Sequence, residues 1–300
     1  MKSLVIGMGI GQLYKSVLEA AGHEVTTVDL DPARGADFTD VGTAIVGRYF
    51  DTVHICTPNW THEPIARQVA DVARIVFIEK PGLQRAYNWQ CLVEDFPKTR
   101  FMMVKNNQYR SNIEELKAQA KESPVVSLKW INKNRVPNAG SWFTDSDRSW
   151  GGVSRDLIPH LLSLVAVFEP NFADLKVVYS SAFQRWIVAD LTDTEYGTVN
   201  QDGIYDVDDF AAMTFQNANR TYQLTADWRS NTTDDRGIDF WPAADGTTFY
   251  RFELGLCPED AYARMIDTAF RNVYNDSYWD QQLAQDLWIH QQMELLCPAA

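Results

Sequence analysis

The chain has 300 residues, 45% hydrophobic and 22% charged, which is typical of a soluble globular protein with room for two domains. Its formal net charge of −13 and its pI of about 4.8 argue against nucleic acid and anionic membranes as partners. The cysteines form no C-x-x-C pair, so they indicate thiols in a reducing cytoplasm, and no metal site is expected. We expect neither a signal peptide nor a membrane-spanning segment.

The chain opens with a predicted strand, a glycine turn and a helix. Residues 3–6 are apolar, and residues 12–21 have a helical pattern. Three glycines lie between them: Gly7, Gly9 and Gly11. In a dinucleotide-binding fingerprint the first glycine permits a tight turn, and the second lets backbone amides approach a pyrophosphate at the helix N-terminus. The third glycine of G-x-G-x-x-G would stand at Gln12, so either the turn is one residue shorter or Gly11 takes over the close-packing role.

The second predicted strand, residues 24–29, is β-branched and ends in an acid, Asp29. A carboxylate about 20 residues after such a turn accepts hydrogen bonds from ribose hydroxyls and repels a 2′-phosphate, which favours NAD over NADP. Asp31 can share this role, and Arg34 keeps NADP open. The alternative is that Asp29 only forms the turn that follows the strand.

Two more strands are predicted over residues 51–56 and 75–78. The second of them ends abruptly in Glu79, Lys80 and Pro81. Because proline cannot donate to a β-ladder and disfavours helix at the preceding residue, Lys80 is held at the C-terminal edge of a sheet. Open α/β sheets bind their ligands at that edge. The alternative is a solvated strand-end lysine with Glu79 as its ion partner.

Alternation of strands and helices continues to residue 104 and makes about five strand–helix units. This pattern predicts a doubly wound parallel sheet with right-handed crossovers, an α/β domain of the Rossmann type over residues 1–108. The rest, residues 109–300, is expected to form an α+β domain. Its strands are predicted over residues 125–132, 174–183, 208–216, 220–229, 237–241 and 247–254. Residues 192–207 are predicted to be a loop, and residues 112–121, 259–272 and 280–296 to be helices.

Asp156 and His160 stand four residues apart in the second domain, after two glycines. On one helix this spacing places both side chains on the same face, although Pro159 removes a helical hydrogen bond and can kink the segment. An aspartate in that position can orient an imidazole and set its tautomer, which leaves the other ring nitrogen for proton transfer. The alternative is a helix-start aspartate and a core histidine.

In their order and spacing these motifs resemble the Gfo/Idh/MocA family, which includes glucose–fructose oxidoreductase and inositol dehydrogenase. The matching residues are Gly7, Gly9, Asp29, Thr57, Pro58, Asn59, His62, Glu79, Lys80, Pro81, Gly151, Gly152, Asp156 and His160. The resemblance implies that Asp156 and His160 line the substrate site beside Lys80. It also implies a large, mostly antiparallel open sheet in the second domain, which would join subunits into a homodimer or homotetramer. Where the family often has Asn-Arg-Phe, this chain has Asn-Gln-Tyr, so the arginine is replaced.

The sequence therefore predicts an NAD(P)-dependent dehydrogenase or reductase acting on a CH–OH group of a sugar, sugar derivative or cyclitol. Lys80 and His160 are rival candidates for the base, with Asp156 orienting the histidine. The residues expected to contact the cofactor are Gly7, Gly9, Gly11, Gln12, Asp29, Thr57, Pro58, Asn59, His62 and Glu79. Those expected to contact the substrate are Asn107, Tyr109, Trp142 and Trp150.

Two other functions fit the same architecture. A biliverdin reductase-like enzyme would reduce a tetrapyrrole, which mixing with biliverdin and reduced cofactor would reveal. A non-catalytic dinucleotide-sensing protein would use the fold without chemistry, and the irregular glycine turn is the one feature that favours it. Retention of Lys80, Asp156 and His160 favours the polyol dehydrogenase over both.

Overall fold

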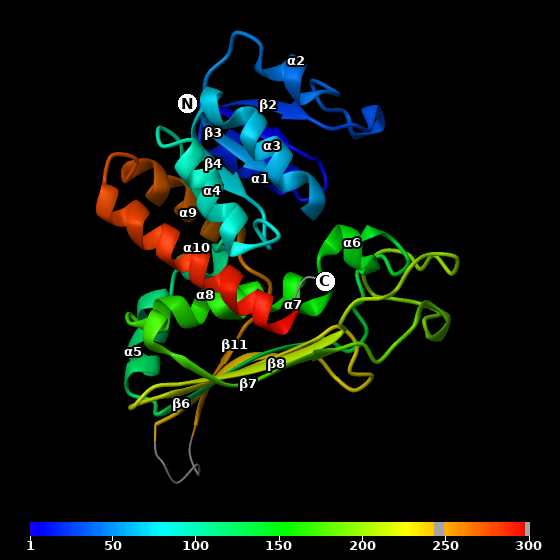
Figure 1. Ribbon diagram of the computed structural model, residues 1–300, viewed down its shortest axis with the longest axis vertical. Helices are drawn as coiled ribbons and strands as arrows, with labels where there is room; N and C mark the ends of the chain where they lie inside the picture. The colour runs from blue at the N-terminus through cyan, green and yellow to red at the C-terminus, as the bar shows by residue number, and fades with distance from the viewer. Residues whose placement is uncertain (243–248, 298–300) are drawn as a thin grey trace. The chain divides into compact units, whose positions relative to one another are not determined.

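The computed structural model describes residues 1–242 and 249–297, and the packing of its backbone divides the chain into two compact units (Figure 1). The first unit comprises Met1–Tyr109 with Pro258–His290, and the second comprises Arg110–Cys257 with Gln291–Ala300. The division after Tyr109 lies one residue from the expected domain boundary. Residues 258–290, expected in the second domain, pack instead with the first unit, where Tyr262 meets Tyr14 edge to face at 5.3 Å between ring centroids.

The first unit is built on a five-stranded parallel sheet with the strand order β2-β1-β3-β4-β5. Its strands are β1 (Lys2–Ile6), β2 (Glu24–Val28), β3 (Phe50–Ile55), β4 (Ala73–Ile78) and β5 (Arg100–Met103). Its helices are α1 (Gly11–Ala20), α2 (Val41–Ile45), α3 (His62–Val69), α4 (Ala86–Asp95), α9 (Glu259–Arg271) and most of α10 (Asp276–Leu296). The central strands are buried almost throughout, as expected for parallel strands covered on both faces. The strand order reverses between β1 and β3, which is where such sheets bind ligands.

The second unit contains a six-stranded sheet with the order β11-β10-β6-β9-β8-β7, in which only β6 and β9 run parallel. Its strands are β6 (Val125–Ile131), β7 (Lys176–Phe183), β8 (Phe210–Gln216), β9 (Thr221–Asp227), β10 (Asp235–Trp241) and β11 (Tyr250–Glu253). Its helices are α5 (Ile113–Lys121), α6 (Ser146–Ser149), α7 (Val153–Asp156) and α8 (Ile158–Phe168). The mixed α/β fold predicted from the sequence, with a parallel and a mostly antiparallel sheet, is thus confirmed. The first two residues of the strand predicted over 247–254 lie outside the described residues.

One face of the second sheet is covered and the other is open. Along β6, β8 and β9 buried and half-buried residues alternate, as expected when a single face packs on a core. The helices α5, α7 and α8 lie on the covered side (Figure 1). Because α8 is buried on nearly all sides, its apolar composition is that of a core helix.

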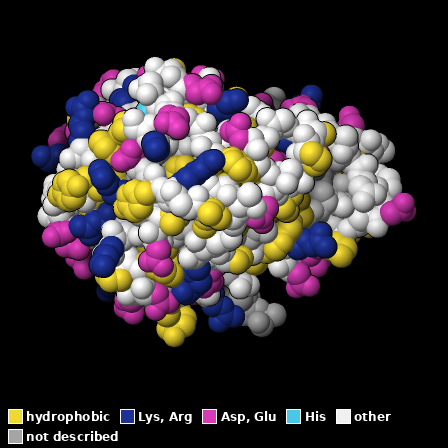
Figure 2. Space-filling model, turned by 90° about the horizontal axis from the view of Figure 1, so that it is seen from above, with side chains coloured by type: hydrophobic (Ala, Val, Ile, Leu, Met, Phe, Trp, Pro, Cys, Tyr) yellow, Lys and Arg dark blue, Asp and Glu magenta, His cyan; other side chains and the backbone are white. Residues whose placement is uncertain are grey.

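Surface charge and helix composition bear on possible partners. In the space-filling view, acidic and basic side chains are interspersed over the visible face (Figure 2). Within residues 1–242 and 249–297, no single helix is both long and apolar enough to cross a bilayer. The same part of the chain holds no group of three or more His, Cys, Asp or Glu side chains placed to bind a metal ion.

Candidate active site

The glycine turn lies at the carboxyl end of β1, beside the point where the strand order reverses. Gly7 has a φ of 90°, and a Cβ there would lie 2.7 Å from the carbonyl oxygen of Cys56. A Cβ at Gly11 would lie 2.9 Å from a methyl group of Val5, so Gly11 is the glycine that packs the helix closely against the strand. At Gly9 no described atom lies within 4 Å of the Cβ position. No described side chain caps the N-terminus of α1, so its first amides and the space at Gly9 can accept a pyrophosphate.

Asp29 fastens the glycine turn to the end of β2. Its Oδ2 accepts a hydrogen bond from the backbone N–H of Met8 at 2.6 Å, and its Oδ1 accepts one from the N–H of Asp31 at 2.9 Å. A carboxylate has about four acceptor sites, so these bonds leave capacity for ribose hydroxyls. Asp29 can therefore both shape the turn and receive a nucleoside.

His62 ties together two loops at the same sheet edge. The side chain is buried, with Nδ1 2.7 Å from the carbonyl oxygen of Gly82 and Nε2 2.8 Å from that of Thr57. Because carbonyl oxygens only accept, both hydrogen bonds form together only when the ring carries two protons. Burial lowers the pKa of His62, and the two carbonyl groups oppose that shift. The histidine thus holds the loop after β3 against the turn after β4, and a direct contact with a dinucleotide stays a prediction.

Glu79 and Lys80 leave the end of β4 in different environments. Glu79 is buried, and its Oε1 accepts a hydrogen bond from the Tyr14 hydroxyl at 2.6 Å. Its Oε2 accepts one from the backbone N–H of Lys80 at 3.1 Å. Burial, followed by the charge of Glu79, raises the pKa of Tyr14 well above its ordinary value. Helix α1 therefore holds Glu79 in place, and the half-buried Lys80 extends from a fixed backbone.

Asp156 and His160 lie on two helices, with a break at the position where Pro159 was expected to kink the segment. Asp156 ends α7, Leu157 follows, and α8 begins at Ile158 with Pro159 in its first turn. Proline is favoured there because it has no N–H to leave unpaired, and its ring ends the preceding helix. The segment Ser146–Asp156 and helix α8 are bent by 46° relative to each other at the break. Asp156 and His160 therefore flank a bend.

Two tryptophans that the sequence did not single out define the surroundings of this pair. The indole Nε1–H of Trp228 donates to Oδ2 of Asp156 at 2.9 Å. The ring of Trp130 stacks on that of His160, with 5.3 Å between centroids and 24° between planes. Alternation along β6 marks Trp130 as inward-facing, whereas Trp228 is 72 residues from Asp156 in sequence and no local pattern links them.

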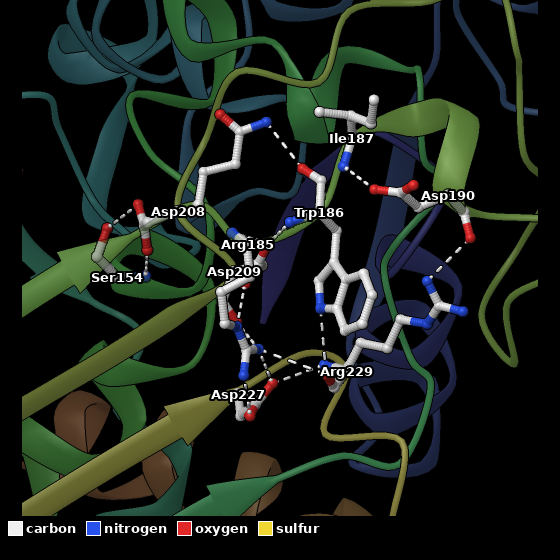
Figure 3. A network of polar contacts seen from close by, with 10 residues as sticks. Ser154, Arg185, Trp186, Ile187, Asp190, Asp208, Asp209, Asp227 and Arg229 are labelled. Carbon is white, nitrogen blue, oxygen red and sulfur yellow. Dashed lines mark hydrogen bonds and ion pairs between the residues drawn. The ribbon is translucent and has the colours of Figure 1, made fainter.

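The start of α7 is held by a buried carboxylate, Asp208. Its oxygens accept from the backbone N–H groups of Gly152 and Ser154 at 2.9 and 2.7 Å, and from the Ser154 hydroxyl at 2.8 Å (Figure 3). A Cβ at Gly152 would lie 1.8 Å from the Asp208 carbonyl oxygen, so only glycine allows this approach. The glycine pair in the motif thus admits the backbone that anchors the helix carrying Asp156.

The residues expected to contact the substrate lie in different surroundings. Trp142 stacks on Phe143 with 3.8 Å between centroids, and Trp150 has a φ of 66°, a left-handed conformation that non-glycine residues adopt at an energetic cost. Asn107 is buried in the first unit, and the Tyr109 hydroxyl lies 3.0 Å from that of Tyr278. Their contacts with substrate stay predictions.

The structure brings most of the predicted cofactor residues to one edge of the first unit. The glycine turn follows β1, Asp29 follows β2, the segment from Thr57 follows β3, and Glu79 with Lys80 follows β4. Gln12 lies exposed in the first turn of α1, and Asn59 is buried beside His62 in the loop after β3. Asp156 and His160 belong to the second unit.

A scan against protein-family models finds no match. A curated relative from Amycolatopsis mediterranei (strain S699), named "Putative UDP-kanosamine synthase oxidoreductase subunit", is 26% identical over 291 residues, 86% of this chain and 77% of the relative. The solved structure of GenD2 from gentamicin A biosynthesis, in complex with NAD, matches 99% of this chain and 93% of its own, at 18% identity and a TM-score of 0.74. Levoglucosan dehydrogenase with NADH and levoglucosan matches 99% of this chain and 96% of its own, at 13% identity and a TM-score of 0.76. These structures share the fold over nearly the whole chain.

Proposed function

We propose that this chain is a nicotinamide-dependent sugar dehydrogenase or reductase. Its motifs resemble those of the Gfo/Idh/MocA oxidoreductases, and the curated relative and the solved neighbours support that resemblance. The observation that carries the proposal is the convergence of four predicted cofactor segments at the carboxyl edge of one parallel sheet, with open space at Gly9. Both named neighbours are solved with NAD or NADH. One of them also holds a sugar-like molecule, levoglucosan.

The first unit would hold the cofactor. Backbone amides at Gly9 and at the start of α1 would receive the pyrophosphate, and Asp29 would receive a ribose. When bound, the nicotinamide ring supplies or accepts the hydride at a substrate carbon. We favour NAD because Asp29 would repel a 2′-phosphate. In addition, Nε of Arg34 lies 4.0 Å from Oδ2 of Asp31, so the arginine that could pair with that phosphate already has a carboxylate neighbour.

A proton must move when a hydroxyl carbon is oxidised or a carbonyl carbon is reduced. Lys80 and His160 are the two candidates to exchange it, and the ammonium form of Lys80 would also stabilise a developing alkoxide. Asp156 would orient His160 and fix its tautomer. The stacked Trp142 is suited to the apolar face of a sugar ring, as is Trp150. We propose a sugar, sugar derivative or cyclitol as the substrate class.

The test is a screen of sugars, cyclitols and nucleotide sugars with NAD and NADP, read as nicotinamide absorbance. Removal of a proton-transferring side chain costs about 100-fold or more in kcat, so we expect that loss for Lys80→Ala. Calorimetry should show NAD binding little changed in the same variant. Lys98→Ala, at an exposed loop lysine, is the matched control and should behave like the wild type.

The outcomes separate the candidate functions. Wild-type turnover in Lys80→Ala would contradict the role of Lys80 and leave His160 as the base. Binding of a dinucleotide without turnover of any polyol would favour a sensing protein, and turnover of biliverdin alone would favour a tetrapyrrole reductase. If neither cofactor binds, the proposed function is wrong.

We also propose that the chain forms a homodimer or homotetramer through the open face of its six-stranded sheet. That face carries exposed apolar side chains on the edge strand β7, among them Tyr179 and Phe183. We place the protein in the cytoplasm, because none of its four cysteines forms a disulfide and thiols persist in reducing compartments.

A further inference from the structure

The indole of Trp228 is directed at a single polar group. The side chain is 1% exposed, and its Nε1–H lies 2.9 Å from Oδ2 of Asp156. An indole nitrogen can only donate a hydrogen bond, and an ionised carboxylate can only accept one, so the two groups match. A hydrogen bond to an ionised group is shorter and about twice as strong as one between neutral groups. The contact therefore fixes where one oxygen of Asp156 lies.

The backbone of Trp228 is itself held on both sides. Its N–H donates to the carbonyl oxygen of Asp209 at 3.1 Å, and its carbonyl oxygen accepts from the N–H of Arg135 at 2.8 Å. The preceding residue, Asp227, accepts from Nη2 of Arg185 at 2.5 Å and from the N–H of Arg229 at 2.7 Å. The held backbone and the burial of the ring, which is 1% exposed, restrain the indole from following Asp156 if the carboxylate moves.

The guanidinium of Arg185 also links the end of β9, next to Trp228, to the segment before β8. Nε of Arg185 donates to Oδ1 of Asp209 at 2.7 Å, and the guanidinium also reaches Asp227, so it lies between two carboxylates (Figure 3). The Asp209 and Asp227 side chains are 0% and 6% exposed, so this cluster is screened weakly by solvent. The ends of β8 and β9 are thereby fixed relative to each other.

Two adjacent aspartates, Asp208 and Asp209, consequently hold the backbone of Asp156 and the donor that faces its carboxylate. Asp208 binds the N-terminal amides of α7, and its carbonyl oxygen accepts from the N–H of Val153 at 2.9 Å. Asp209 holds the backbone of Trp228. The backbone position of Asp156 and the donor that faces its carboxylate thus depend on one dipeptide.

We propose that Trp228 is a positioning residue, whose indole N–H holds the Asp156 carboxylate in the orientation in which it serves proton transfer by His160. This inference rests on the proposed function. Trp228 then affects kcat only through Asp156, and its indole contacts neither substrate nor cofactor.

The test is a double-mutant cycle with Trp228→Phe and Asp156→Asn. Phenylalanine keeps an aromatic ring in the core and removes the N–H. A hydrogen bond to a charged group corresponds to a change of about 10-fold or more, so Trp228→Phe should lower kcat by that factor with little change in KM or in NAD affinity. In the Asp156→Asn background the same substitution should lower kcat less than about 2-fold. Equal losses in both backgrounds would show that Trp228 acts only through packing and would overturn the inference.

A second variant keeps the inference testable if Trp228→Phe fails to fold. Replacement of Trp228 by the isosteric benzothienyl analogue substitutes sulfur for the N–H at the same ring volume, and it should reproduce the loss in kcat. A readout without turnover is the indole N–H resonance that disappears in Trp228→Phe. It should be protected from solvent exchange and should shift in Asp156→Asn. An unshifted resonance would contradict the inference, whereas absence of any dinucleotide turnover beside a shifted resonance would contradict only the proposed function.

Discussion

Lys105 and Asp286 form a fully buried ion pair in the first unit. Both side chains are 0% exposed, Nζ of Lys105 donates to Oδ1 of Asp286, and the N–H of Met103 donates to Oδ2 at 3.1 Å. Burial raises the pKa of Asp286 to about 6 and lowers the pKa of Lys105. Desolvation thus opposes the charge on each partner, and each depends on the other to remain ionised.

We expect Asp286→Ala to destabilise the protein by about 3–5 kcal/mol at pH 7, because it leaves the Lys105 ammonium buried without a counter-ion. The double variant Lys105→Met/Asp286→Leu removes both charges and should recover most of that loss. Urea unfolding of the three proteins measures the difference. An Asp286→Ala variant as stable as the wild type would show that the pair contributes nothing.

The same side chain sets a pH dependence with a defined sign. The pKa of Asp286 in the folded protein, about 6, lies above the ordinary unfolded value of about 3.9, so the folded state takes up the extra proton as the pH falls. The contribution of this group to stability therefore rises by about 1 kcal/mol between pH 7 and pH 5. Asp286→Ala should accordingly lower the free energy of unfolding more at pH 5 than at pH 7. A smaller loss of stability at pH 5 would contradict the raised pKa of Asp286.

At the scale of single elements, the glycine turn contains one glycine with a structural role and one placed to bind a ligand. Gly7 has a positive φ and abuts the Cys56 carbonyl, whereas Gly9 borders open space. Gly7→Ala should therefore lower the free energy of unfolding by about 1–3 kcal/mol or more. Gly9→Ala should leave stability nearly unchanged and weaken NAD binding by about tenfold or more, because a methyl group would occupy the path of the pyrophosphate.

Denaturant unfolding and calorimetry on both variants check this prediction. The two glycines serve as controls for each other, since they are two residues apart on the same turn. If Gly9→Ala bound NAD as tightly as the wild type, the pyrophosphate would have to lie elsewhere.

The elements themselves were largely predictable, because apolar runs such as residues 75–78 carry the signature of buried strands. The break between Asp156 and His160 was visible in Pro159, although not its position at Leu157. Helix α9, expected in the second domain, packs with the first unit. Its amphipathic pattern predicts an apolar face, but a periodic pattern does not state which core that face will meet.

The residues of the candidate site likewise divide into those that the sequence could predict and those that it could not. Residues at strand ends, such as Asp29 and Lys80, could be found because their position follows from the strand that precedes them. Trp228, Asp208 and Tyr14 were missed. Their roles depend on contacts between segments far apart in sequence, and such contacts leave no local spacing to recognise.

For the whole molecule, the segment predicted to be a loop, residues 192–207, has an ordered place in the second unit. Residues 192–207 bond repeatedly to residues 134–146: Glu195 N–H to Asn134 O at 2.9 Å, Asn138 N–H to Tyr196 O at 3.0 Å and Asn200 N–H to Ala139 O at 2.8 Å. It thereby braces the stretch that carries Trp142. The open face of the sheet has no comparable cover among the described residues of this chain.

That open face is graded from apolar to charged. At the β7 edge Tyr179 is 52% exposed, and Phe183 meets Phe210 with 5.0 Å between ring centroids. At the opposite edge Nη1 of Arg251 binds Asp239 at 2.8 Å. An exposed edge strand with apolar side chains is a template for association, and a closed symmetric dimer would cover it on both copies.

We therefore expect Tyr179→Lys to dissociate the oligomer, because an ammonium group on the covered face would be buried without a partner. Light scattering coupled to gel filtration should show a multiple of 34.2 kDa for the wild type and a monomer for the variant. Tyr87→Lys, at a tyrosine that is 74% exposed in the first unit, supplies the matched control and should keep the wild-type mass. A Tyr179→Lys variant with the wild-type mass would place the subunit contacts elsewhere, and a monomeric wild type would exclude them.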